Sequence, residues 1–145
     1  MSVSVGLQMD NKLQEVAADA ACFVCGAENP IGLQASFVTD REASSSSAKL
    51  ELTSNYQGWQ DVIHGRIVAS LLDESCIYAC RAKAEQCVTA ELQVRYRKPV
   101  PVGAQVEVSG QLTDSSRKVW QATAQLKIDD SLYAEASAKV FVLDR

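Results

Sequence analysis

Two residues of one expected helix have the chemical types that could act together on the carbonyl group of an acyl compound. Gly65 falls where an amphipathic segment begins, and the first N–H groups of a helix are free to donate to an oxygen that gains negative charge. Asp73 lies in the middle of that segment with no basic residue three or four positions away. Such a carboxylate is either solvated or placed to serve as a base or nucleophile. A glycine that only permits a tight turn is the plainer alternative for Gly65.

Three neighbours of this pair are further candidates. Glu74, one position round the helix, is the competing acid. His64 is the only histidine of the chain, and a histidine beside a helix start serves the structure more often than it serves as a base. Trp59 could line a pocket for an acyl group or anchor its own loop.

One helix cannot bring Gly65 and Asp73 to the same reacting atom. Eight residues at about 1.5 Å of rise each separate the two backbones by about 12 Å. Two copies whose helices pack antiparallel would place the start of one helix beside the middle of the other. The spacing therefore predicts at least a C2 homodimer with two identical interfacial sites.

The apolar residues of the segments that must position these candidates recur with two different periods along the sequence. Apolar residues recur every three to four positions over 65–82, which predicts one long helix. Alternating apolar and polar residues predict a hairpin over 31–53 and strands over 88–96, 104–108, 120–128 and 132–140. This pattern is typical of an α+β domain in which the helix packs on one face of a curved antiparallel sheet. The alternative is a β-barrel with one inserted helix.

The remaining segments are expected to be less regular. Residues 57–65 are expected to form a loop, and residues 1–20 a peripheral N-terminal arm. Leu13, Val16 and Ala17 would allow one short amphipathic helix in this arm. Along 88–96, simple alternation places Thr89 on the polar face with Arg95.

Composition and charge narrow the class of protein. The chain has 145 residues, of which 47% are hydrophobic and 22% charged, with a net charge of −4. These values predict one globular domain and disfavour a nucleic-acid partner. No membrane-spanning stretch or secretion signal is visible, so a cytoplasmic protein with no membrane partner is expected.

The five cysteines are an odd number, which favours free thiols over a disulfide framework. Cys22 and Cys25 form the only CxxC pair, and a structural zinc site generally needs four ligands, so no metal is expected. Cys76 and Cys80 share the apolar stripe of the helix and are expected to be small buried side chains.

A basic cluster is formed by Arg95, Arg97 and Lys98. Such a cluster could bind the phosphates of coenzyme A despite the negative net charge of the chain. A solvated strand face carries similar charges, so both interpretations stay open.

Several motifs, taken in order, connect the chain to a known family. They are CFVCG at 22–26 with NPIGL at 29–33, Gly58-Trp59, the stretch from His64 to Glu74, and the strand residues 89–99. Over about residues 21–143 the chain resembles the hotdog-fold acyl-CoA thioesterases of the phenylacetate-degradation type. The resemblance implies an arm at 1–20 and a hotdog domain at 21–145, in which a curved antiparallel sheet wraps one long central helix. It also implies hydrolysis of an acyl-CoA thioester without a cofactor.

The resemblance assigns roles to four residues. Gly65 looks like the residue whose N–H group polarises the thioester carbonyl, and Asp73 like the general base or nucleophile. His64 resembles the histidine that shapes the turn, and Thr89 a hydroxyl that helps to position water. One departure is Arg66, which stands where the family has a second glycine. Its side chain could block the thioester or grip a phosphate or carboxylate.

The expected substrate-binding residues are Trp59, Arg66, Glu74, Arg95, Arg97 and Lys98. Water attack and a covalent anhydride both remain open as chemical routes, as do a homodimer and a homotetramer built as a dimer of dimers. The first alternative function is a non-catalytic protein that binds CoA thioesters. The second is a hydratase or dehydratase, which would pair a histidine with an acid.

Overall fold

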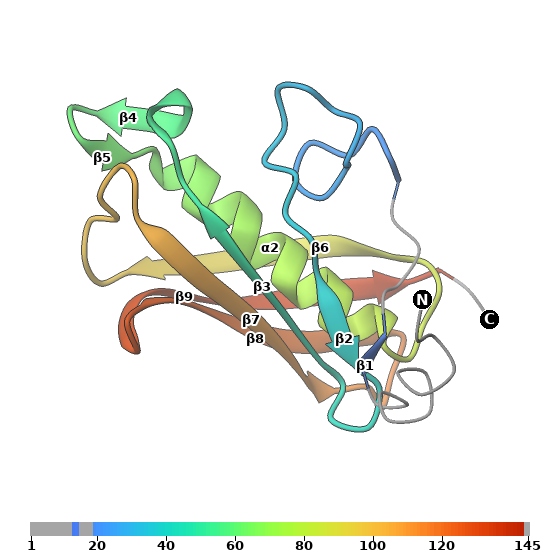
Figure 1. Cartoon of the computed structure of the whole chain (residues 1–145). Helices are drawn as coiled ribbons and strands as arrows, with labels where there is room; N and C mark the ends of the chain where they lie inside the picture. The colour runs from blue at the N-terminus through green and yellow to red at the C-terminus, as the bar shows by residue number, and fades with distance from the viewer. Residues whose placement is uncertain (1–12, 15–18, 144–145) are drawn as a thin grey trace.

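The computed structural model describes residues 13–14 and 19–143. One long helix, α2 (Gly65–Arg81), lies across a large curved antiparallel sheet (Figure 1). The sheet strands are β1 (Leu13–Gln14), β2 (Val38–Asp40), β3 (Ser45–Glu51), β6 (Cys87–Tyr96), β7 (Gln105–Asp114), β8 (Val119–Ile128) and β9 (Ser131–Val142). Their order across the sheet is β1-β2-β3-β7-β8-β9-β6. A 3-10 helix at Ser54–Tyr56 and a small hairpin of β4 (Gln57–Trp59) and β5 (Val62–Ile63) precede α2.

The helix α2 forms because its apolar residues share one face, which the sheet covers. Its buried residues are Val68, Leu71, Leu72, Ser75, Cys76, Tyr78, Ala79 and Cys80. Arg81 lies in the last turn, where the helix dipole favours a cation. The helix expected over 65–82 is therefore confirmed to within one residue at its end.

The strands beneath α2 present small side chains to it, which lets the helix approach the sheet closely. Buried alanines line β8 and β9 at positions 122, 124, 134, 136 and 138. The closest approach is at Gly110 of β7, where a Cβ atom would lie 2.1 Å from the carbonyl oxygen of Ser75. The hydroxyl of Ser46 in β3 donates to the same carbonyl oxygen at 2.7 Å.

A Gly110→Ala variant is expected to lose about 1–3 kcal/mol of unfolding free energy, because the new methyl group would meet helix backbone that cannot move aside alone. Urea denaturation of wild type and variant measures this loss. Gly65→Ala is the control, since its Cβ would lie an ordinary 3.5 Å from Tyr96. Equal stability of the two variants would contradict the close packing of α2 on β7.

The four long strands expected after the helix are confirmed as β6, β7, β8 and β9, with β7 extending well beyond residue 108. The sheet is open in the described part of the chain, because β1 and β6 form its two edges. The alternative of a closed β-barrel is therefore wrong.

The expected elements before α2 differ in part from those of the structure. Residues 33, 35 and 37 are buried as expected, but the regular strand of that hairpin is only Val38–Asp40, paired antiparallel with β3. Leu13, expected in a short helix, lies in strand β1 and pairs with β2, whereas Val16 and Ala17 lie outside the described residues. The expected loop 57–65 holds the β4–β5 hairpin and then the first residue of α2.

A bulge in β6 decides the direction of Thr89. Thr89 pairs with Val140 and Glu91 pairs with Lys139, so Ala90 is an extra residue in β6. Such a bulge shifts the alternation of side chains by one position. Thr89 consequently faces α2, and the expectation that it shares the polar face with Arg95 is wrong.

Candidate active site

The start of α2 carries a free backbone donor. The Nδ1 atom of His64 accepts a hydrogen bond from the N–H group of Arg66 at 3.0 Å and caps the helix. The N–H group of Gly65, in the first turn, has no acceptor among the described residues. The helix dipole adds positive potential at this group, so it suits an oxygen atom that gains negative charge.

The hydrogen bonds of His64 tie both its ring and its backbone to the region where the helix starts. Because Nδ1 accepts from the backbone, the proton of the neutral ring sits on Nε2, which leaves no free basic nitrogen. The N–H group of His64 donates to the carbonyl of Tyr56 at 2.8 Å. A Cβ atom on Gly58 would lie only 2.8 Å from the Cα atom of His64. The glycine before Trp59 is thus required by the close approach of β4 to the helix cap.

Tyr96, at the end of β6, also contacts the helix start. Its hydroxyl donates to the carbonyl oxygen of Gly65 at 2.8 Å. This contact fixes the peptide that follows Gly65 and joins β6 to the first turn of α2. No spacing in the sequence pointed to Tyr96, since it lies 31 residues beyond Gly65.

Asp73 lies half-buried in the middle of α2 and faces β6. The hydroxyl of Thr89 donates to the Oδ1 atom of Asp73 at 2.5 Å. This hydrogen bond orients the carboxylate and leaves Oδ2 for another partner. The structure thus brings Asp73 and Thr89 together, while Gly65 stays eight residues away along the same helix.

Glu74 points to a different neighbourhood from Asp73. Its Oε2 atom lies 3.6 Å from the Sγ atom of Cys22, and Cys25 is within side-chain hydrogen-bond reach. Burial raises the pKa of Glu74 above its usual value, while the bonds from the two thiols act in the opposite direction. Sequence reasoning missed this contact, because it joins residues 52 positions apart.

Arg95 lies near the end of β6 on the face of the sheet away from α2, and Arg97 and Lys98 directly follow that strand. Arg97 forms an ion pair with Glu135, and the ammonium group of Lys98 lies 5.1 Å from the ring centroid of Tyr133. Arg95 stands opposite Glu135 in the register of β6 and β9. Part of the positive charge of this cluster is thus already paired. Arg66 is exposed in the first turn of α2, beside the free donor.

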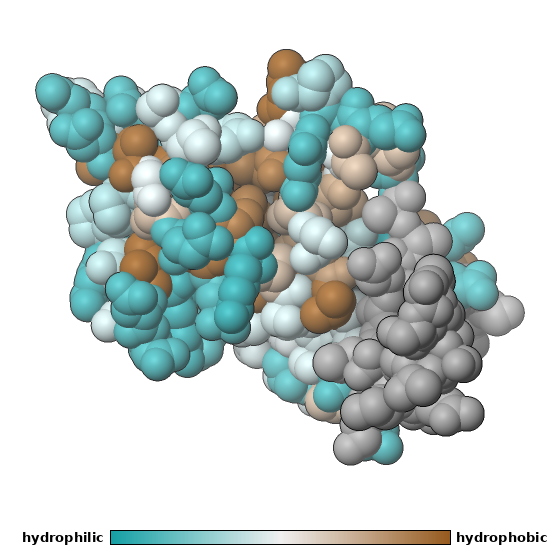
Figure 2. Space-filling view, viewed as in Figure 1, coloured by the Kyte–Doolittle hydropathy of each residue, from teal (hydrophilic) through white to brown (hydrophobic). Residues whose placement is uncertain are grey.

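Trp59 is 80% exposed at the tip of the β4–β5 hairpin. Its side chain is therefore mostly open to solvent in the part of the chain that the structure describes. Figure 2 shows a hollow between this hairpin and the segment near residues 19–33, with hydrophobic surface at its floor. In the same view, α2 runs between these two parts (Figure 1).

The buried cysteines of the helix are unsuited to nucleophilic catalysis. Cys76 and Cys80 are both fully buried, and burial raises the pKa of each thiol to about 12. The thiolate is the reactive form, so these residues fill space in the core, as expected.

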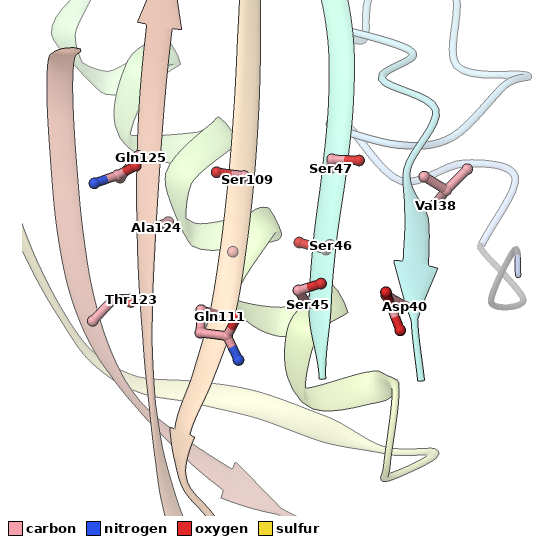
Figure 3. Close-up of a pocket in the computed structure, with 11 residues that line it drawn as sticks. Val38, Asp40, Ser45, Ser46, Ser47, Ser109, Gln111, Thr123, Ala124 and Gln125 are labelled. Atoms are coloured by element: carbon pink, nitrogen blue, oxygen red, sulfur yellow. The ribbon is translucent and has the colours of Figure 1, made fainter. Parts of the chain in front are cut away.

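A separate depression of about 400 Å³ lies on the other face of the sheet from α2 (Figure 3). Its polar lining includes Ser45, Ser47, Ser109, Gln111 and Gln125. Because the sheet separates it from Asp73 and Gly65, it is not part of the candidate site.

Comparison with known proteins agrees with this arrangement. The family model of the thioesterase superfamily matches residues 60–135, which is more than half of the chain. The chain therefore belongs to the thioesterase superfamily. Within the described residues, no helix combines the length and apolar character needed to span a membrane.

Individual relatives share the fold over most of the chain. Acyl-coenzyme A thioesterase THEM4 of Mus musculus is 26% identical over 135 residues, covering 92% of this chain but only 58% of the relative. A solved thioesterase superfamily protein has a TM-score of 0.78 at 21% identity and covers 97% of this chain and 74% of its own. The E. coli PaaI protein of the phenylacetic acid degradation operon has a TM-score of 0.71 at 15% identity, covering 77% and 81%. The likenesses to the two solved structures show the hotdog fold.

Proposed function

We propose that this protein hydrolyses an acyl-CoA thioester to a free acid and coenzyme A. The observation that carries the proposal is the free Gly65 N–H group at the start of a helix whose middle holds Asp73 against Thr89. A THEM4 relative described as an acyl-coenzyme A thioesterase supports this substrate class. So does a Streptococcus mutans structure bound to acetyl CoA, with a TM-score of 0.67 at 16% identity, covering 70% of this chain and 83% of that one.

The reaction needs one donor and one carboxylate at the same thioester carbon. The N–H group of Gly65 donates to the carbonyl oxygen as that oxygen gains negative charge. Asp73 takes a proton from water, whose oxygen then bonds to the carbonyl carbon. When the C–S bond breaks, the sulfur of coenzyme A leaves with the electron pair and receives a proton. Direct attack by Asp73 would place the same oxyanion at Gly65, so both routes use one geometry.

The active unit in this proposal is a homodimer in which Gly65 and Asp73 come from different subunits. Within one helix, the two residues lie about 12 Å apart, which is too far for a shared reacting atom. The edge strand β6 offers a surface for pairing, because among the described strands its ten residues pair only with β9. A long edge strand of this kind is usually paired or protected. Pairing β6 with the same strand of a second copy would also bring the two α2 helices side by side.

In this proposal, the cationic residues near the helix start hold the charged part of coenzyme A. Arg66 is exposed beside the oxyanion donor, and Tyr96 connects Gly65 directly to the strand end that carries Arg97 and Lys98. Phosphate groups favour such arginine and lysine side chains. The hollow beside the β4–β5 hairpin, which carries the exposed Trp59, would receive the acyl group.

A second function is a non-catalytic protein that binds CoA thioesters. Arg66 favours it, since a long cation directly after Gly65 stands where the resembling family has glycine. In that case the dimer and the phosphate contacts would remain, but water would not reach the thioester.

A thiol-release assay over short, long, branched and aromatic acyl-CoA esters tests the two functions, with calorimetric titration of the same esters beside it. Release of free coenzyme A with turnover of at least one ester is expected. Tight binding of several esters without release would overturn hydrolysis and favour the binding protein. Neither binding nor release across the whole panel would overturn both.

A further inference from the structure

Three metal-binding side chains meet where the N-terminal segment crosses the centre of α2. The Sγ atoms of Cys22 and Cys25 and a carboxylate oxygen of Glu74 all lie within 4.8 Å of one another. All three residues are partly buried. The sequence offered only the two cysteines as ligands, and the fold adds the third.

The spacing of these atoms fits a shared zinc ion. Zinc bonds of about 2.3 Å to sulfur and about 2.1 Å to oxygen, at a tetrahedral angle, put the two ligand atoms about 3.6 Å apart. The Sγ atom of Cys22 and the Oε2 atom of Glu74 are 3.6 Å apart. The same bond lengths put two sulfur ligands about 3.8 Å apart, which lies inside the observed limit of 4.8 Å. The ligand atoms would therefore need only small adjustments.

The backbone around the cysteines forms a tight cradle. The N–H group of Cys25 points to the Sγ atom of Cys22 at 3.5 Å, and such contacts from the backbone stabilise a metal-bound thiolate. The N–H group of Gly26 donates to the carbonyl of Cys22 at 2.9 Å and closes the turn. A Cβ atom at Gly26 would lie 2.4 Å from the backbone nitrogen of Cys22. The glycine after Cys25 is thus required for this turn.

The charges near the cluster also suit a divalent cation. Once metal binding has released the thiol protons, the two thiolates and the Glu74 carboxylate would carry three negative charges, and Asp73 adds a fourth nearby. The positive charge of Arg81, further along α2, also acts on Glu74. The hydroxyl of Tyr78 is within hydrogen-bond reach of Cys25. Thiolate ligands select zinc over magnesium or calcium.

We propose that Cys22, Cys25 and Glu74 bind one Zn²⁺ ion, with water as the fourth ligand. Binding releases the thiol protons to solvent and replaces the thiol–carboxylate hydrogen bonds by three bonds to the metal. The ion fastens the segment that begins near residue 19 to the centre of α2. It does so one residue from Asp73, so it steadies the helix turn that holds the carboxylate. The proposal does not depend on hydrolytic activity.

Cobalt titration of the reduced, metal-free full-length protein tests the site. One equivalent of Co²⁺ is expected to give a sulfur-to-cobalt charge-transfer band in the near ultraviolet and tetrahedral bands in the visible. One equivalent of Zn²⁺ should then remove both. Cys22→Ser, Cys25→Ser and Glu74→Gln should each weaken binding by more than the ~10–100-fold that loss of an outer-shell partner costs.

Cys87→Ser is the matched control, because Cys87 is a partly buried cysteine outside the cluster. It should bind Co²⁺ as the wild type does, and circular dichroism should show that all four variants are folded. Absence of the charge-transfer band in the wild type would overturn the proposal. An unchanged band in Cys22→Ser would overturn it as well, since the metal would then lie elsewhere.

Discussion

Replacing Asp73 by asparagine is expected to lower kcat for acyl-CoA hydrolysis by about 10²–10⁴-fold, the range that general bases contribute. Asparagine keeps the size of the side chain and can still accept the hydrogen bond from Thr89. It cannot take a proton from water or attack the thioester. KM should change much less than kcat, because the loss falls on the transition state.

Asp130→Asn is the matched control for this variant. Asp130 is exposed in the β8–β9 turn and has a positive φ of 68°, a backbone conformation that asparagine also tolerates. The control should keep wild-type kcat and KM, and both proteins should unfold at the wild-type urea midpoint. Near-normal turnover by Asp73→Asn would remove Asp73 from the reaction.

A Gly65→Pro variant is expected to lower kcat by about 10²–10³-fold, the cost of removing one oxyanion donor. Proline deletes the N–H group and nothing else that the helix needs. Position 65 is the first residue of α2, where proline is well tolerated. His64 has φ −58° and ψ 133°, an extended conformation that the residue before a proline favours. The substitution therefore tests the donor without breaking the element that holds it.

Gly65→Ala serves as the partner control, because alanine keeps the N–H group. Its Cβ would lie 3.5 Å from the Tyr96 ring, an ordinary contact. We expect Gly65→Ala to retain most of the activity and both variants to keep the thermal midpoint of the wild type. If proline and alanine at position 65 lower kcat equally, the loss comes from crowding and the role of the N–H group is refuted.

The sequence predicted those parts of the fold that depend on local periodicity. The apolar stripe from Val68 to Cys80 predicted the helix, because a helix with these residues on one face can bury that face against the rest of the protein. Alternation gave the long strands β7, β8 and β9 for the same reason. Both patterns depend only on residues that are close in the sequence, so they can be recognised without knowing the contacts of the rest of the chain.

Features that depend on contacts between distant segments could not be predicted in this way. The bulge at Ala90 turns Thr89 toward Asp73, and alternation alone placed Thr89 on the opposite face. Tyr96 reaches Gly65 only because β6 ends beside the start of α2. Each of these contacts is set by tertiary packing, which overrides the local pattern.

The candidate site residues also differ in whether the local sequence pattern or the tertiary contacts determine their surroundings. Gly65 as a helix-start donor followed from where the helix had to begin. The separation of Asp73 from Glu74, one facing Thr89 and the other the two cysteines, required the fold. Adjacent residues on a helix point about 100° apart, so what faces each of them depends on segments far away in the sequence.

The most direct test of the shared site is complementation between two inactive subunits. Asp73→Asn and Gly65→Pro chains with different affinity tags are produced together, and the mixed dimer is purified through both tags. One of its two sites then has both functional residues, and the other has neither. If the donor and the carboxylate come from different subunits, the mixed dimer should recover about half of the wild-type kcat per dimer. Activity as low as that of the two parent variants would contradict the account, because each site would then take both residues from one chain.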